Sequence, residues 1–193
     1  ENSSLARVDL SDANLSQSFF FYSNLADADL SRANLSRANL SGANLSRANL
    51  SGADLTGVNL SGADFTRADL SEANFTDADL SFASFNRADL SGCSLRQSNL
   101  EQASLQGANL RSANLRSAIL AGAILKDTDR GNSSLATISQ LSLSNLQQDN
   151  KIDFCSANLI GANLQGVNLQ NANFRFALLF KATLEKVNLN SAS

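Results

Sequence analysis

The stretch S-R-A-N-L-S-R-A-N-L-S-G-A-N-L-S-R-A-N-L, residues 31–50, repeats one five-residue phrase four times. Leucine or phenylalanine occupies every fifth position from Leu5 to Leu125, usually with alanine two places earlier and Asn or Asp in between. After Leu125 the phase breaks, and the pattern resumes with a shifted phase over 154–189. A short fixed period over most of a chain indicates a repeat architecture.

A period of five suits neither regular element. On an α-helix, five residues turn about 500°, so successive leucines would drift by about 140° around the axis. On a flat strand, an odd period would place successive leucines on opposite faces. The chain must therefore turn a corner in each repeat. Alanine and leucine then point inward, Asn or Asp points outward, and the next two residues, often Ser-Gly or Ser-Arg, form the corner.

The units A-N-L-S-R, A-N-L-S-G and A-D-L-S-G resemble the pentapeptide-repeat proteins over nearly the whole chain. The resemblance implies an all-β fold, a right-handed quadrilateral parallel β-helix with four repeats per coil and about nine coils in all. We expect one domain over 1–193, with regular repeats over 1–125, an irregular segment over 126–153 and phase-shifted repeats over 154–189. The polar residues 147–151 are expected to form a loop.

The inward positions predict the core. Leucines fill most of them, and phenylalanines fill positions 20, 65, 75, 85, 154 and 174. With twenty residues per coil, Phe65 and Phe85 should lie in one column, one coil apart.

Residues suited to catalysis are scarce. The chain has no histidine, which removes the commonest general base and metal ligand. Of the two cysteines, Cys93 takes an inward small-residue position, and Cys155 should face outward without a base beside it. We therefore predict no enzyme activity, no cofactor and no metal site.

The charges form columns when residues twenty apart are aligned. Arg47, Arg67 and Arg87 form one column, beside an acidic ladder of Asp9, Asp29, Asn49, Asp69, Asp89 and Asn109. The ladder could mimic DNA or bind a hard cation. The neighbouring arginines favour a solvated face that neutralises itself.

The two halves of the chain differ in net charge. Residues 1–90 carry 12 acids and 6 bases (−6), whereas residues 91–193 carry 6 acids and 9 bases (+3). The pI near 4.9 and the lack of interleaved basic and aromatic residues predict no nucleic-acid binding.

The best interaction candidates are departures from the repeat. Phe19, Phe21 and Tyr22 occupy outward positions that are normally polar, and Ile119 and Ile124 replace the outward Asn or Asp. Exposed apolar patches mark a partner or a covering segment. For Ile119 and Ile124 the segment 126–153 is the favoured cover, and the aromatic residues are predicted to pack against either a further N-terminal segment or another protein.

No apolar run approaches the length of a membrane helix. We expect a soluble cytoplasmic, lumenal or periplasmic domain. Repeats reach both ends without capping segments, which predicts a domain of a longer or membrane-tethered protein, a processed form, or ends that meet partners or each other end to end.

Two function classes follow. The first is a non-catalytic scaffold that offers a rigid rod to a protein partner of unknown identity. The alternative is a DNA mimic that inhibits or protects a type II topoisomerase, as some pentapeptide-repeat proteins do.

Overall fold

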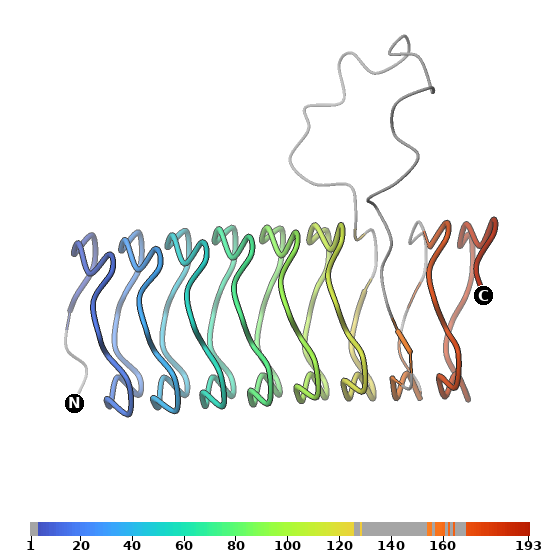
Figure 1. Ribbon diagram of the computed structural model, residues 1–193, viewed down its shortest axis with the longest axis horizontal. Helices are drawn as coiled ribbons and strands as arrows, with labels where there is room; N and C mark the ends of the chain where they lie inside the picture. The colour runs from blue at the N-terminus through green and yellow to red at the C-terminus, as the bar shows by residue number, and fades with distance from the viewer. Residues whose placement is uncertain are drawn as a thin grey trace, which may run out of the picture.

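The computed structural model describes residues 4–125, 128, 154, 155, 157–160, 162, 164 and 169–193. The backbone winds into coils that stack in one straight row, with the two chain ends at opposite ends of the rod (Figure 1). Central residues pair in parallel with those twenty positions on, as Asp9 does with Asp29. Each pairing joins the central residues of two successive coils, and no helix is present in the described part of the chain.

Twenty residues contain four pentapeptides, so each coil has four sides. We name the sides by their columns of outward central residues. Side A carries Ser4, Asn24, Asn44, Asp64, Ser84, Ser104 and Ile124. Side B carries Asp9, Asp29, Asn49, Asp69, Asp89 and Asn109. Side C carries Asn14, Asn34, Asp54, Asn74, Ser94 and Asn114. Side D carries Phe19, Asn39, Asn59, Asp79, Asn99, Ile119, Asn158 and Leu178. Corners AB, BC, CD and DA lie between adjacent sides.

A β-turn forms each corner. In the turn that begins at Leu25, the N–H of Ala28 donates to the carbonyl of Leu25 over 3.1 Å. Asp27, the third residue of this turn, has a φ of +58°. A positive φ at the third position is the mark of a type II turn. The predicted corners are therefore present at the expected positions.

Hydrogen bonds between coils replace the ladder of an ordinary sheet. The N–H of Leu30 donates to the carbonyl of Asn49 over 2.7 Å, and the N–H of Asp29 donates to the carbonyl of Val8 over 2.9 Å. The same two bonds recur on all four sides. Each coil is thus bonded to the coils on both sides of it, which makes the rod rigid.

The core lies along the axis of the rod, as predicted. The inward leucines and alanines from Leu25 to Leu125 are fully buried. The rings of Phe65 and Phe85 stack in one column, 5.0 Å apart and 4° from parallel, and Phe75 meets both edge-on at 6.4 Å. The ring spacing matches the distance of about 4.8 Å between neighbouring strands.

The phase break leaves the columns in register. Ile119 on side D pairs with Asn158, which pairs with Leu178. The first step spans 39 positions and the second spans 20, so the chain has 19 more residues than one coil needs between Ile119 and Asn158. Apart from Thr128, the segment 126–153 and its expected loop at 147–151 lie outside the described residues.

Candidate functional site

All five residues predicted as an interaction surface are exposed. The exposed fraction is 75% for Phe19, 67% for Tyr22 and 40% for Phe21, and it is 42% for Ile119 and 41% for Ile124. The first three lie together on side D and corner DA of one coil. Ile119 lies on side D five coils away, and Ile124 lies on side A just beyond corner DA.

A glycine in the next coil makes room for the ring of Tyr22. Gly42 follows Tyr22 by one coil in corner DA, and a Cβ atom on Gly42 would lie 2.5 Å from the ring. At Gly62, one coil further, a Cβ would meet nothing within 4 Å. The ring of Phe21 meets that of Tyr22 edge-on at a centroid distance of 6.4 Å. The aromatic residues are therefore held in place against the rod.

Five further outward apolar side chains are exposed and escaped the sequence-based prediction, whereas the exposed Leu184 and Leu189 occupy inward positions of the last coil. The five are Phe82, Ile160, Phe176, Leu178 and Phe180, and Phe176 is 76% exposed. The signal that identified Ile119 and Ile124 applies to them as well, because each stands where the repeat normally has a polar residue. Three of them come from one stretch, F-R-F-A-L-L-F at 174–180.

The outward apolar side chains gather on one side of the rod. Phe19, Ile119 and Leu178 lie on side D, Phe176 lies on corner CD, and the DA corner carries Phe21, Tyr22, Phe82, Ile160 and Phe180. Only Ile124 lies beyond these columns. Sides B and C and corners AB and BC have no exposed large apolar side chain that points outward, within the part of the chain that the structure describes. We call side D with corners CD and DA the side D surface.

Cations accompany the aromatic rings at the C-terminal end of this surface. The guanidinium carbon of Arg175 lies 5.6 Å from the centroid of the Phe176 ring, and the Lys181 Nζ lies 5.3 Å from that of Phe180. Both are within the range of cation–π attraction. Arg96 and Arg116 precede Arg175 in the same corner column. This end of the surface is both apolar and basic.

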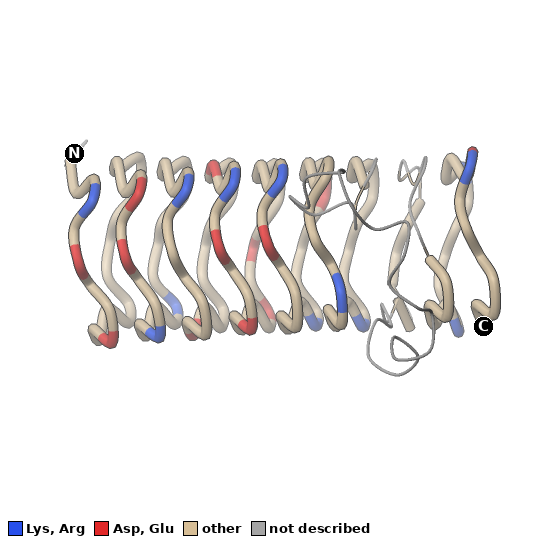
Figure 2. Tube along the Cα trace, turned by 90° about the horizontal axis from the view of Figure 1, so that it is seen from above, with Lys and Arg blue, Asp and Glu red and all other residues tan. Residues whose placement is uncertain are grey.

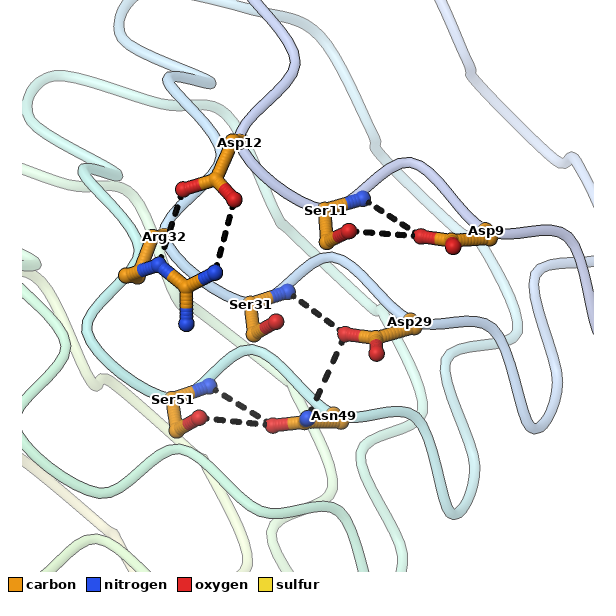
Figure 3. Close-up of polar contacts among 8 residues, drawn as sticks. All are labelled: Asp9, Ser11, Asp12, Asp29, Ser31, Arg32, Asn49 and Ser51. Carbon is orange, nitrogen blue, oxygen red and sulfur yellow. Dashed lines mark hydrogen bonds and ion pairs between the residues drawn. The ribbon is translucent and has the colours of Figure 1, made fainter.

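The corners BC and AB are polar and form ion pairs between successive coils. Arg32 binds Asp12 with two hydrogen bonds of 2.8 and 2.6 Å, and Arg47 binds Asp27 with two of 2.6 and 2.8 Å (Figure 3 shows the first pair). The guanidinium groups lower the pKa values of Asp12 and Asp27. Both pairs run along a corner column, between successive coils.

The acidic ladder on side B is interrupted by amides. The Asn49 Nδ2 donates to Asp29 Oδ1 over 3.2 Å, and the Asn109 Nδ2 donates to Asp89 Oδ1 over 2.9 Å. Acidic and basic residues also alternate along the N-terminal coils (Figure 2). Among the described residues, no group of three or more Cys, Asp or Glu side chains could hold a metal ion. The two amides therefore lower the density of carboxylates along side B.

The thiol of Cys93 is fully buried, as its inward position predicted, and burial raises its pKa. Such a thiol stays protonated and is a poor nucleophile. Cys155 is half-buried at corner CD, and neither cysteine is in a disulfide.

Comparison with known sequences identifies the class of protein. Residues 23–62, 59–97, 93–129 and 153–193 match the family description pentapeptide repeats, with eight copies. The chain belongs to the pentapeptide-repeat family. No curated protein matches the chain significantly in sequence.

Two solved structures illustrate the likeness. One is HetL, a pentapeptide-repeat protein involved in heterocyst differentiation regulation from the cyanobacterium Nostoc sp. strain PCC 7120. It is 32% identical, with a TM-score of 0.51, over 99% of this chain and 84% of HetL. The other is QnrB1, a plasmid-mediated fluoroquinolone resistance protein, at 21% identity and a TM-score of 0.54 over 67% of this chain and 81% of QnrB1.

These likenesses confirm the expected fold. The chain is a right-handed quadrilateral β-helix, of a class used for protein interaction rather than for a known chemistry. At 21% identity, QnrB1 bears on the fold alone. Among the described residues, there is no helix with the length and apolar composition needed to span a bilayer.

Proposed function

We propose that the protein is a non-catalytic scaffold that binds another protein chain through the side D surface. One observation carries the proposal: of the outward exposed apolar side chains among the described residues, all but Ile124 belong to this surface. In a monomer with no partner, such residues would have no reason to avoid the other sides. Contiguous exposed apolar surface is typical of interaction sites.

The N-terminal aromatic cluster of Phe19, Phe21 and Tyr22 provides the anchors of this surface. Aromatic side chains contribute more binding energy than most residue types at protein interfaces. The backbone is fixed and the Tyr22 ring packs against Gly42. Both features reduce the conformational entropy that is lost on binding. A rigid rod with anchors on one side is suited to holding a partner in a fixed position.

The proposal includes the absence of catalysis. A catalytic site needs a nucleophile or base whose pKa suits its task, with a partner that orients it. The chain has no histidine, and its inward thiol is protonated. Purified protein should therefore show no hydrolase, transferase or redox turnover.

Affinity capture from the source cells tests the binding surface. The variant Phe19→Ser/Phe21→Ser/Tyr22→Ser should melt at the wild-type temperature, because none of the three side chains belongs to the core. Its capture of partner proteins should fall at least tenfold. The control Arg7→Ser/Asp9→Ser changes the same coil on corner AB and side B, away from the surface, and should capture partners normally. Equal capture by both variants would exclude the aromatic cluster as the binding site.

The topoisomerase alternative has less support from the charges. A DNA mimic presents uncompensated acids at regular spacing, as phosphates do. Here Asp12 and Asp27 are paired with arginines, and the column of side B acids is interrupted by Asn49 and Asn109. A DNA-supercoiling assay with a bacterial type II topoisomerase discriminates the two functions. We expect neither inhibition nor protection at micromolar concentrations of the protein.

A further inference from the structure

We infer that the side D surface binds a second copy of the chain, packed against it in the antiparallel direction. This inference rests on the proposed function and names the partner of the same surface. In the dimer, the N-terminal aromatic cluster of one copy would face the C-terminal apolar residues of the other, and the reverse.

The positions of the apolar residues support a two-fold arrangement. The cluster of Phe19, Phe21 and Tyr22 lies at one end of the surface, and Leu178 and Phe180 lie at the other. Seven bridges along side D separate Phe19 from Leu178, which is about 34 Å at about 4.8 Å per coil. An interface between identical copies must be self-complementary. Two apolar clusters at the ends of one flat side satisfy this condition when the copies run in opposite directions.

The charges select the antiparallel direction over the parallel one. On the side D surface, the four coils that begin with Phe19 carry Arg37, Asp77 and Asp79, a net −1. The next four carry Arg96, Glu101, Arg116, Arg175 and Lys181, a net +3. The chain as a whole shows the same asymmetry, −6 before residue 91 and +3 after it. Parallel packing would place like charge against like charge, whereas antiparallel packing places opposite charges together.

The two-fold axis would cross side D between Asp79 and Asn99, midway along the column. Phe19 would then face the partner's Leu178, and Tyr22 would face the partner's Phe180 and the partner's Lys181. A lysine beside a tyrosine ring adds a cation–π contact. Near the axis, Asp77 would face the partner's Arg96.

Small residues allow the two surfaces to approach between these anchors. Corner DA carries Gly42 and Gly62 in one half and Ala121 and Gly122 in the other. In the antiparallel register, Gly62 faces the partner's Ala121 and the partner's Gly122. At these positions corner DA carries no bulky residue, whereas Phe82 on the same corner places an exposed ring beside the two-fold axis.

The size of the surface is sufficient for a specific dimer. Eight coils at about 4.8 Å and a side of about five residues give roughly 38 by 16 Å, or about 600 Å² per copy. The total of about 1,200 Å² is at the lower end of specific interfaces. We therefore expect a dimer that dissociates on dilution.

Sedimentation equilibrium of the 193-residue protein tests the inference. At tens of micromolar, the mass should be twice the 20.4 kDa of one chain. Leu178→Ser/Phe180→Ser should weaken the dimer at least tenfold, and Phe19→Ser/Phe21→Ser/Tyr22→Ser should weaken it equally, since the two clusters face each other. Leu178→Ile should remain a dimer.

Thiol cross-linking tests the direction. Arg37 lies on corner CD two coils from the start of the surface, and Cys155 lies on the same corner two coils from its end. The single substitution Arg37→Cys should therefore give a covalent dimer with a short bismaleimide through the partner's Cys155. Arg67→Cys, on corner AB, should not. This test needs no change to an apolar anchor, so it stands even if the serine variants fold poorly.

Three results would overturn the inference. The first is a monomer at 100 µM wild-type protein, a concentration about a hundredfold above a micromolar dissociation constant. The second is equal cross-linking of the Arg37→Cys and Arg67→Cys variants. The third is efficient cross-linking of a Leu178→Cys variant to itself, which requires parallel copies. None of these results bears on the scaffold function, which the affinity capture tests separately.

Discussion

At the scale of the residue, the outward Asn or Asp of each pentapeptide has a structural task. In the repeat around Asn34, the N–H of Ser36 donates to Asn34 Oδ1 over 3.0 Å, and the Ser36 hydroxyl donates to the same oxygen over 2.7 Å. Figure 3 shows the equivalent contacts of Asp9 and Asn49. The N–H of Ser36 has no backbone acceptor, so the side-chain oxygen of Asn34 satisfies it.

This capping role gives the first prediction. Asn34→Ala removes the acceptor of the Ser36 N–H and should lower the free energy of unfolding by about 1 kcal/mol, the usual value of one hydrogen bond. Asn34→Asp keeps a side-chain oxygen at the same place and should be close to neutral. Urea unfolding of both variants measures the difference. Equal losses would show that the amide contributes through something other than its Oδ1.

The inward leucine gives the second prediction. Leu45 is fully buried among apolar side chains, so the carboxylate of Leu45→Asp would have no partner. Burying an unpaired charge costs several kcal/mol, and the variant should not fold. Asn44→Asp introduces the same side chain one position earlier, where it points outward, and should melt like wild type. A cooperative wild-type melt of Leu45→Asp would contradict the inward assignment.

The sequence predicted which side chains point inward and which point outward, but it did not predict their hydrogen bonds and ion pairs. The period of five, with alternation around Asn or Asp, was enough to place Leu45 inside and Asn44 outside. It could not reveal that the Asn oxygen binds the backbone two residues later, because an outward polar residue is equally compatible with plain solvation. The ion pairs of Arg32 and Arg47 were missed for the same reason, since they depend on which corner residues stack.

At the scale of the coil, the glycines of the corners leave room for the side chain one coil before. Gly52 follows Arg32 and Gly57 follows Arg37 in their columns, and a Cβ on either glycine would lie 3.6 Å from the arginine side chain. Gly42 follows Tyr22, and a Cβ there would lie 2.5 Å from the tyrosine ring. Because non-glycine residues also occupy these positive-φ positions, the backbone alone does not demand glycine. The side chain of the preceding coil decides how much a Cβ costs.

The third prediction compares alanine substitutions at Gly42 and Gly62. Both have a left-handed φ, +65° and +69°, so alanine carries a similar backbone penalty of about 1 kcal/mol at each. Only Gly42→Ala also displaces the Tyr22 ring, so it should be the more destabilising variant. Tyr22 is the only tyrosine of a chain without tryptophan, so tyrosine fluorescence reports on this ring alone. The fluorescence should change in Gly42→Ala and stay unchanged in Gly62→Ala. Identical spectra in all three proteins would show that the ring does not depend on Gly42.

The sequence predicted part of the side D surface. Phe19, Phe21 and Tyr22 followed from the repeat, because each breaks it in the regular region. Their relation to Leu178 and Phe180 did not, because it depends on the register across the phase break. The 19 additional residues between Ile119 and Asn158 are not a multiple of the pentapeptide, so the sequence gives no column for anything after them. Pairing between coils fixes that register.

At the scale of the whole molecule, the rod combines two properties that the sequence showed separately. Its core and its bonds between coils repeat regularly from Leu25 to Leu125, whereas its outward side chains differ from side to side. Among the described residues, sides B and C carry only polar or small outward residues, whereas the side D surface carries all the exposed outward apolar ones except Ile124. Since every side has the same backbone, changes to the outward residues alter binding without altering the fold. This separation is what allows one solenoid family to serve unrelated functions.

The ion pairs of the corners give the last prediction, the response of the rod to acid. Arg32 and Arg47 lower the pKa values of Asp12 and Asp27 below their ordinary 3.8. The unfolded chain therefore binds more protons than the folded chain as the pH falls toward and below 4, and stability decreases in that direction. The contribution is complete above about pH 5 and is lost as the pH falls through the lowered pKa values. Both pairs are exposed to solvent, so the effect should be small and should weaken in 0.5 M salt.

Thermal melts between pH 7 and pH 2.5 measure this response. The midpoint of wild type should be level from pH 7 to pH 5 and fall below pH 4. Asp12→Asn/Asp27→Asn removes the carboxylates of both ion pairs, so its midpoint should be slightly lower at pH 7 and fall less on acidification. Asp54→Asn is the matched control, because Asp54 accepts hydrogen bonds from Thr56 and forms no ion pair in the structure. If the double variant and the control lose stability in parallel with wild type, the corner ion pairs do not govern the acid response, and the charge balance of the rod as a whole does.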